Sequence, residues 1–335
     1  VILIGFTFNK NRLVPVKEQK FVLGTLGGIN VYSNTKRQGE KAISLAYERI
    51  EEIENLMSTS VEGSDIYNIN KNAGIKPVKV DPSTMMVISR GLKYHDITQK
   101  TFNIGLGSLI ELWGIGEDSP KVPATWEITE AKKHIHLDNL EISEKSSTVF
   151  IKDPEMSLDL GGIAKGYAVD EAVRILKENE IESGIVNLGG DIFTFGKKSD
   201  NTLWKIGISN PRTGKDGNVI IRILVADKSV VTSGDYERFF TKDGVKYHHI
   251  IDFKTGMPAD NGVVSATVIS DKCMNADIVS TAAFILGVEE GLQLIESQPN
   301  MEGLIITNNS EIYISSGLKD ELQILDDNFK IVNQK

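Results

Sequence analysis

Residues 159–170 read DLGGIAKGYAVD, in which an acidic residue is followed by two glycines, a lysine and the start of an apolar, helix-like pattern. Glycines at a strand-to-helix turn allow backbone groups to approach a diphosphate closely, and the N-terminus of the helix adds partial positive charge. Lys165 adds a full positive charge. The spacing matches neither the P-loop nor the dinucleotide-binding fingerprint. By itself, the segment indicates either a turn that approaches a ligand or a tight turn with a surface lysine.

A second glycine pair lies in residues 187–191, NLGGD, between two apolar runs. This pattern is typical of a hairpin-like turn, which we expect Asp191 to cap. Its backbone can lie near a ligand, although a turn alone explains the pattern.

Residues 275–284, NADIVSTAAF, place Asp277 and Thr281 four positions apart on a predicted helix. This spacing puts a carboxylate and a hydroxyl on one face of the helix. Both are hard oxygen ligands, and Mg²⁺ commonly combines a few such side chains with waters and substrate phosphates. The structural alternative is that Asp277 caps the helix and Thr281 bonds its own backbone.

Two adjacent histidines stand in residues 247–258, YHHIIDFKTGMP. A strand directs His248 and His249 to opposite faces, so only one of them can face a site. There an imidazole, which titrates near neutrality, can accept a proton from an attacking hydroxyl. Just upstream, residues 233–240, SGDYERFF, are dense in polar groups, and we expect Arg238 to pair with a carboxylate inside the fold.

The remaining chain mixes strands and helices without a regular alternation. Apolar residues at three- and four-residue steps predict helices, and alternating apolar residues predict strands. The predicted helices are 40–57, 83–95, 108–113, 169–178 and 276–286, and the predicted strands are 21–32, 204–208, 219–225, 263–269, 303–307 and 312–315. A loop is expected at 117–129, which contains two prolines. The mixture favours an α+β, mixed-sheet architecture over a doubly wound one.

Composition sets limits on the partners of the chain. Its 335 residues, 40% hydrophobic and 25% charged, can build one large core or two modest ones. The net charge of -9 argues against nucleic acid or an anionic membrane surface as the main partner. A single cysteine, Cys273, excludes an internal disulfide and a cysteine-built zinc site.

The first six residues, VILIGF, are apolar but too short to span a membrane. We therefore predict that residues 1–20 are an N-terminal extension, the remnant of a signal or anchor, and that the folded domain is 21–335.

Five segments, taken in order, closely resemble the FAD:protein FMN transferase family, also called the ApbE family. They are DLGGIAKGYAVD, NLGGD, SGDYERFF, YHHIIDFKTGMP and NADIVSTAAF. The resemblance extends from Leu23 through residues 101–116 to Gly317, nearly the whole chain. Each segment has a structural explanation alone, but their occurrence together and in this order favours the family. The resemblance implies an α+β, mixed-sheet architecture related to the T-fold, with a cleft for the flavin nucleotide.

The resemblance also implies roles for residues that match the family's motifs. Metal binding is implied for Asp277, Thr281 and the backbone carbonyl of Gly162. Contacts with the flavin nucleotide are implied for Leu23, Thr101, Phe102, Asn103, Asp159, Lys165 and Ile251. His249 matches the family's proposed general base. Asn103 stands where an aspartate is common, and Leu23 where a methionine is usual, so the departures fall among the flavin contacts.

The implied activity is Mg²⁺-dependent transfer of FMN from FAD to a Thr or Ser hydroxyl of an acceptor flavoprotein, with release of AMP. Mg²⁺ and Lys165 would neutralise the pyrophosphate while His249 deprotonates the hydroxyl. The alternatives are a metal-dependent FAD pyrophosphatase, which gives FMN and AMP, and an FAD-binding protein without turnover. The family also implies a location outside the cytoplasm, as a membrane-anchored lipoprotein.

Overall fold

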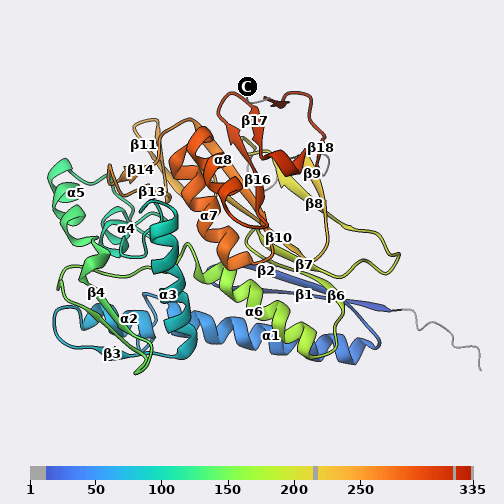
Figure 1. The fold of residues 1–335 in the computed structure, drawn as a ribbon, viewed down its shortest axis with the longest axis horizontal. Helices are drawn as coiled ribbons and strands as arrows, with labels where there is room; N and C mark the ends of the chain where they lie inside the picture. The colour runs from blue at the N-terminus through green and yellow to red at the C-terminus, as the bar shows by residue number, and fades with distance from the viewer. Residues whose placement is uncertain (1–12, 214–217, 320–321, 333–335) are drawn as a thin grey trace, which may run out of the picture.

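The structure is a computed structural model that describes residues 13–213, 218–319 and 322–332. Within these residues, the largest part is a nine-stranded sheet with the order β1-β2-β6-β7-β10-β15-β16-β17-β19 (Figure 1). Its strands are β1 (Val14–Val22), β2 (Thr25–Ser33), β6 (Ser183–Leu188), β7 (Asp191–Phe195), β10 (Lys228–Gly234), β15 (Val263–Ser270), β16 (Glu302–Thr307), β17 (Glu311–Ile314) and β19 (Lys330–Ile331). Neighbouring strands are antiparallel, except that β17 and β19 are parallel. Helices interleaved with this mainly antiparallel sheet confirm the predicted α+β class.

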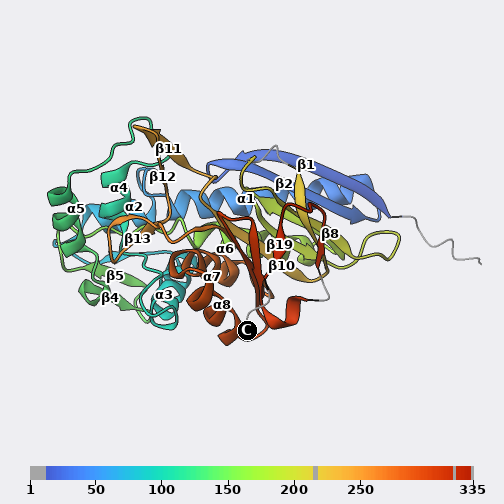
Figure 2. The same ribbon diagram turned by 90° about the horizontal axis from the view of Figure 1, so that it is seen from above.

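A layer of helices covers one face of the large sheet. It consists of α1 (Lys36–Met57), α6 (Ala164–Glu178), α7 (Cys273–Leu286) and α8 (Val288–Ser297). Helix α1 packs on β1 and β2, α6 on β6 and β7, α7 on β10 and β15, and α8 on β16. Seen from above, β1 and β2 lie across α1 (Figure 2). The predicted apolar stripe of α1 makes this contact, because Ala46, Ile50 and Ile53 are fully buried.

A smaller sheet covers the opposite face. Its order is β18 (Leu322–Ile324), β9 (Val219–Val225) and β8 (Trp204–Ser209). Successive strand residues point to opposite faces. On β10, Val230 accordingly packs with the small sheet and Val231 with the helix layer. The central strand β15 is buried along its whole length, which explains its nearly continuous apolar sequence.

A further group of elements lies beside the large sheet, on the left of Figure 1. It contains α2 (Asp65–Lys71), α3 (Pro82–Ile97), α4 (Gly107–Trp113), α5 (Thr125–Ala131), the sheet of β3 (Val78–Lys79), β5 (Thr148–Ile151) and β4 (Leu140–Ser143), and the hairpins β11 (Phe239–Lys242) with β12 (Val245–His248) and β13 (Ile251–Asp252) with β14 (Met257–Pro258). Short 3₁₀ turns occur at Lys132–His134, Leu137–Asn139 and Ser316–Leu318. Leu109, Trp113, Ile128 and Ile251 form part of a separate buried cluster in this group.

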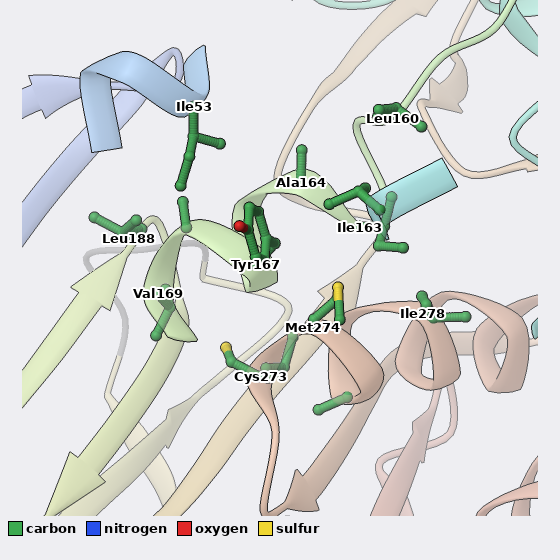
Figure 3. Close-up of a cluster of buried hydrophobic side chains, with 14 of the residues drawn as sticks. Ile53, Leu160, Ile163, Ala164, Tyr167, Val169, Leu188, Cys273, Met274 and Ile278 are labelled. Carbon is green, nitrogen blue, oxygen red and sulfur yellow. The ribbon is translucent and has the colours of Figure 1, made fainter. Parts of the chain in front are cut away.

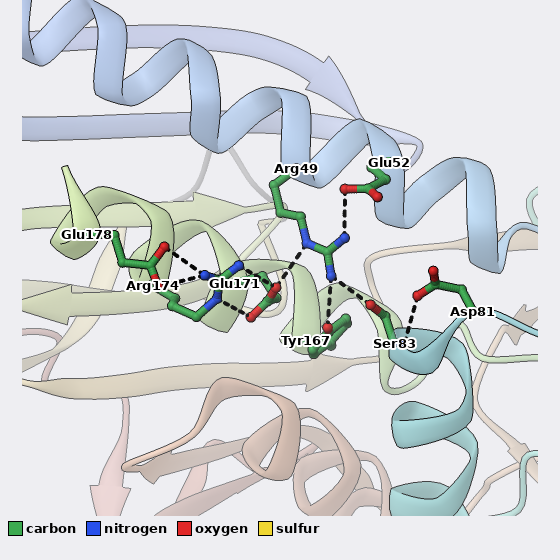
Figure 4. A network of polar contacts seen from close by, with 8 residues as sticks. All are labelled: Arg49, Glu52, Asp81, Ser83, Tyr167, Glu171, Arg174 and Glu178. Atoms are coloured by element: carbon green, nitrogen blue, oxygen red, sulfur yellow. Dashed lines mark hydrogen bonds and ion pairs between the residues drawn. The ribbon is translucent and has the colours of Figure 1, made fainter. Parts of the chain in front are cut away.

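A polar network joins three helices (Figure 4). The guanidinium of Arg49 on α1 donates to Glu171 at 2.9 Å and to Tyr167 at 3.1 Å, both on α6. It also donates to Ser83 on α3 at 2.8 Å. Only 14% of the Arg49 side chain is exposed, so these bonds satisfy donors that burial removes from water. The network holds α6 against α1 and α3.

The N-terminal boundary differs from the sequence expectation. Strand β1 begins at Val14, within the stretch expected to be an irregular extension, and pairs with β2 along its length. As an edge strand it buries only Val16 and Val22, so its sequence lacks a clear alternating pattern. The apolar residues 1–6 lie outside the described part of the chain. No helix in residues 13–213, 218–319 and 322–332 is both long and apolar enough to cross a bilayer.

Two helices also begin where the sequence did not predict them. Helix α5 forms inside the expected loop 117–129, because Glu127 accepts a bond from the backbone of Ala124 and caps the first turn. Helix α6 begins at Ala164, five residues before the predicted start. Its first turn contains Gly166, a weak helix former, and the contact with α7 outweighs that preference.

Candidate active site

The three residues implied as metal ligands lie together where α6 and α7 begin. A Cβ placed on Gly162 would be 4.0 Å from Oγ1 of Thr281, and Asp277 lies one turn before Thr281 on α7. The two helix starts share a buried cluster, in which Met274 of α7 is directed toward Ile163 and Tyr167 (Figure 3). The turn after Asp159 is therefore placed beside the oxygen-bearing face of α7.

A buried ion pair lies next to these residues. Nζ of Lys165 is 2.5 Å from Oδ1 of Asp191, whose side chain is fully buried. Burial lowers the pKa of Lys165, but the carboxylates of Asp191 and Asp277 outweigh this effect and raise its pKa overall. Lys165 is therefore a permanent cation at this position, as the predicted contact with a pyrophosphate requires.

Asp191 does not have the role expected for it. It begins β7 and pairs with Lys165, while the turn at 187–190 is closed by the Asn187 side chain, which accepts a bond from the backbone of Gly190 at 2.9 Å. The glycine pair predicted the turn but did not mark Asp191 as a site residue. An aspartate directly after a glycine pair was the only available signal in the sequence, and it is common in hairpins.

The carboxylate pair fits a hard divalent cation. Burial raises the pKa of Asp277 well above its usual value, and Asp191 adds to that shift. Oδ2 of Asp191 is buried and has no hydrogen-bond partner. Two close carboxylates with an unsatisfied oxygen favour a nearby cation. Asp277, the Thr281 hydroxyl and the Gly162 carbonyl would hold Mg²⁺, which takes oxygen ligands and fills its other positions with water or phosphate.

The described residues contain no cluster of three or more His, Cys, Asp or Glu side chains that suits a metal ion. This finding is compatible with Mg²⁺, because two side chains and a backbone carbonyl suffice when a substrate supplies phosphate oxygens.

The two adjacent histidines are in different environments. His248 is buried, and its Nε2 lies 2.9 Å from the carbonyl of Ala259, so it holds the fold. His249 is half-buried, with Nδ1 3.2 Å from the carbonyl of Arg238. Nδ1 must carry the proton to bond that carbonyl, which leaves Nε2 as the proton-accepting nitrogen. Burial lowers the pKa of His249 to about 4, and the charges of Arg238 and Lys165 contribute.

Arg238 lies among several glycine-containing turns. A Cβ placed on Gly24 would be 3.7 Å from its Nη2, and one placed on Gly116 would be 3.5 Å from its Cδ. Burial raises the pKa of Asp159, while the backbone of Gly161 and the charge of Arg238 oppose this effect. The charge of Arg238 thus favours the ionised form of Asp159, whose Oδ1 also accepts the Gly161 N–H at 2.7 Å.

The predicted flavin contacts at 101–103 are largely buried. Thr101, Phe102 and Asn103 are 2%, 6% and 9% exposed. The Asn103 amide donates to Ile135 and accepts from Gly105, so it fixes this loop. An aspartate would lose the donated bond. The ring of Phe102 is 3.1 Å from a Cβ placed on Gly162, so the loop borders the predicted metal position.

Leu23 and Ile251, also predicted flavin contacts, lie at different places. Leu23 occupies the β1–β2 turn at φ 50°, and its N–H donates to Glu54 at 3.0 Å. Ile251 is 5% exposed and belongs to the buried cluster around Trp113. The structure thus brings Gly162, Lys165, Asp277 and Thr281 together, with His249 near Lys165, and it places Ile251 inside a core.

Two cavities of the described chain lie away from these residues. One, of about 460 Å³, is lined by residues of α3, α7 and α8 and the turn at Gln99. Another is lined by residues 218–219 and 325–328. The flavin-nucleotide cleft implied by the resemblance therefore stays a prediction.

Comparisons with known proteins agree with one another. The sequence model of the ApbE family matches residues 23–305. The FAD:protein FMN transferase of Treponema pallidum is 33% identical, over 97% of this chain and 94% of that protein. One from Klebsiella pneumoniae is 32% identical, over 88% of this chain and 91% of that protein.

Solved structures give the same result. The ApbE protein of Thermotoga maritima superimposes with a TM-score of 0.85 and 33% identity, covering 92% of this chain and 99% of that one. The flavin transferase ApbE of Vibrio cholerae gives a TM-score of 0.82 and 29% identity, with the same coverage of both chains.

Proposed function

Because the chain belongs to the ApbE family and is an FAD:protein FMN transferase, we propose that it uses Mg²⁺ to transfer FMN to a Thr or Ser hydroxyl of an acceptor flavoprotein, releasing AMP. The family resemblance of the five motifs is thereby confirmed. The metal, the type of hydroxyl and the leaving group are the parts that we propose.

One observation carries the proposal. The Thr281 hydroxyl lies beside Gly162, and the Asp277 carboxylate accepts the N–H of Gly166, next to the cation Lys165. A buried oxygen of Asp191, the partner of Lys165, has no hydrogen-bond partner there. A pyrophosphate is the group that such a site suits, since it brings oxygens for a metal and negative charge for a lysine.

The proposed reaction is a displacement at the FMN phosphorus. The acceptor hydroxyl oxygen attacks the FMN phosphorus, the P–O bond to the AMP half breaks, and the hydroxyl proton passes to Nε2 of His249. Lys165 would hold a pyrophosphate oxygen, and bound Mg²⁺ would offset the charge that develops on the phosphoryl oxygens. His249 is neutral at neutral pH because its pKa lies near 4, so its accepting form is present. An approaching pyrophosphate would raise that pKa and make the base stronger.

The test is the intact mass of a small acceptor domain that contains a threonine, incubated with the protein, FAD and Mg²⁺ or with EDTA. We expect a Mg²⁺-dependent gain of one FMN phosphoester. The Asp277→Ala and His249→Ala variants should lose most of this gain. Asp271→Asn is the matched control, because Asp271 pairs with Lys228 at the surface just before α7.

Different products would indicate a different function. Free FMN and AMP without acceptor labelling would indicate a pyrophosphatase, in which water attacks the same phosphorus. FAD recovered intact would indicate a binding protein. A fully active His249→Ala variant would exclude that residue as the base, and an unchanged Mg²⁺ requirement in Asp277→Ala would exclude that metal ligand.

We also propose that the protein works outside the cytoplasm, anchored to the membrane as a lipoprotein. The family resemblance supports this location. Fractionation of cells that express the native gene tests it. Recovery in the membrane fraction with protease accessibility from outside is expected, and a protease-protected cytosolic protein would contradict it.

A further inference from the structure

Asp170 makes two bonds that no step of the proposed reaction uses. It lies in the second turn of α6, and its carboxylate accepts the N–H groups of Cys273 at 3.0 Å and Met274 at 3.1 Å. These are the first two residues of α7. The first N–H groups of a helix have no partner within the helix, so Asp170 supplies from α6 what α7 lacks.

The opposite bond is also present. The N–H of Gly166, in the first turn of α6, donates to Oδ2 of Asp277 at 3.0 Å. Each helix therefore offers a carboxylate to the N-terminus of the other. Asp277, which is a predicted metal ligand, is one member of this reciprocal pair, and Asp170 is the other.

The helices are also in direct backbone contact. A Cβ placed on Gly166 would lie 2.6 Å from the carbonyl oxygen of Cys273, closer than side chains approach. Cys273 itself is fully buried. With so little space between the backbones, a small shift of α7 moves Asp277 and Thr281 relative to Gly162 and Lys165.

We propose that Asp170 is a positioning residue, which holds the start of α7 against α6 so that Asp277 and Thr281 meet the Gly162 carbonyl. This inference rests on the proposed Mg²⁺ site. Asp170 is not one of the predicted metal ligands, and its carboxylate bonds the backbone of α7. Burial raises the pKa of Asp170 to about 6, and its two bonds to α7 oppose that shift. The carboxylate is therefore ionised at neutral pH although burial disfavours its charge. Its two hydrogen bonds to the start of α7 stabilise that charge.

The test compares Asp170→Ala and Asp170→Asn with Asp81→Ala. Asp81 is a matched control, because it is half-buried and its carboxylate accepts the Ser83 N–H at 2.7 Å, capping α3. Helix α3 carries none of the predicted metal ligands. Mn²⁺ binding to the purified protein without FAD is measured by electron paramagnetic resonance, together with Tm and the Mg²⁺ concentration that gives half-maximal transfer.

We expect Asp170→Ala to weaken Mn²⁺ binding about 10- to 100-fold, as removal of a partner behind a metal ligand commonly does. Asp170→Asn keeps one acceptor oxygen and should show a smaller loss. Asp81→Ala should lower Tm by a similar amount while leaving Mn²⁺ affinity within about twofold.

A lowered Tm with unchanged Mn²⁺ affinity in both Asp170 variants would overturn the proposal, since Asp170 would then be only a helix cap. If Asp170→Ala does not fold, the Mn²⁺ affinity of Asp170→Asn tests the proposal. If the wild-type protein binds Mn²⁺ only when FAD is present, the same comparison is made with FAD. Failure of the wild-type protein to bind Mn²⁺ both without and with FAD would instead contradict the Mg²⁺ site itself, and the positioning role with it.

Discussion

Two turns in this protein share the letters Leu-Gly-Gly and use their glycines for different reasons. In Leu188-Gly189-Gly190 both glycines have positive φ, 61° and 107°, and they form a two-residue hairpin between β6 and β7. Few other residues adopt that backbone. The glycines of Leu160-Gly161-Gly162 have no positive φ. There, Gly162 leaves space, because a Cβ would lie 3.1 Å from the Phe102 ring and 4.0 Å from the Thr281 hydroxyl.

The comparison teaches that a glycine pair in a sequence does not tell whether conformation or space requires it. One turn shapes the sheet, and the other keeps a surface open beside Thr281. The ion pair of Lys165 with Asp191 joins the two, since each residue follows one of the turns. Substitutions at the turns and at this ion pair separate the two roles.

The largest expected effect comes from breaking the ion pair between Lys165 and Asp191. Lys165→Met leaves the buried carboxylates of Asp191 and Asp277 without their cation. Removing one partner of a buried pair commonly costs about 3–5 kcal/mol, so we expect a loss of that order in the free energy of unfolding at pH 7, measured in urea. The double variant Lys165→Met/Asp191→Leu should recover much of it. A loss below about 1 kcal/mol would mean that water screens the pair, as at a surface.

The next largest effect comes from filling the space that Gly162 leaves. Gly162→Ala adds a methyl group beside the Phe102 ring and near Thr281, which a shift of a few tenths of an ångström can accommodate. We expect little change in the unfolding free energy but a loss of about 10- to 100-fold in FMN transfer, because small displacements at a reacting site are costly. Transfer assays at saturating FAD and Mg²⁺ measure it. An unaffected rate would show that Gly162 serves only the turn.

Gly189→Ala tests the conformational role. An alanine at φ 61° is strained by about 1–2 kcal/mol, and its Cβ would lie 2.5 Å from Oγ1 of Thr25. We expect a lower unfolding free energy in urea while the transfer rate per folded molecule stays near that of the wild type. The opposite result, a stable but inactive variant, would mean that this turn also approaches the substrate.

The smallest effect near neutral pH concerns His249, which follows neither turn. Its folded pKa of about 4 lies below its usual 6.5, so it is neutral, and able to accept a proton, throughout pH 6–8. His249 should therefore add no acid limb to kcat/KM for FAD in this range, whereas protonation of Asp170, whose pKa is about 6, should lower kcat/KM as the pH falls through 6. His249 contributes to stability above pH 6.5, and this contribution is lost as pH falls toward 4, because protonation favours the unfolded chain.

The pH profile of the wild type and of His249→Gln measures this prediction. The variant should lose most activity at every pH, and the remaining activity should keep the fall near pH 6 that Asp170 causes. A fall near pH 6.5 that is present in the wild type and absent from the variant would contradict the burial of the imidazole.

Much of the fold could be predicted from the sequence. The apolar periodicity of α1 and of the central strands is strong because each is buried on a continuous face. The prediction was weakest where local structure depends on neighbours. Strand β1 has few buried residues and is held by its pairing with β2. Helix α5 depends on the bond of Glu127 to Ala124, in a segment whose prolines indicated a loop.

The candidate site divides in a similar way. The resemblance of the motifs supplied Gly162, Lys165, Asp277 and Thr281, and the structure brings these residues together. The resemblance also implied that Ile251 contacts the flavin nucleotide, whereas the side chain of Ile251 packs in a buried cluster. The bond from Asp170 to α7 spans 103 positions, and no local pattern predicts a contact of that kind.

The sequence by itself determined the α+β class, the glycine turns and the family, because periodicity and ordered motifs are local properties of the chain. The tertiary structure decided which glycine leaves space, which histidine keeps a free nitrogen, and that Asp191 meets Lys165 rather than capping a turn. The physical reason is that burial, charge pairing and the approach of two backbones depend on residues far apart in the chain, and these come together only when α6 and α7 pack on the sheet.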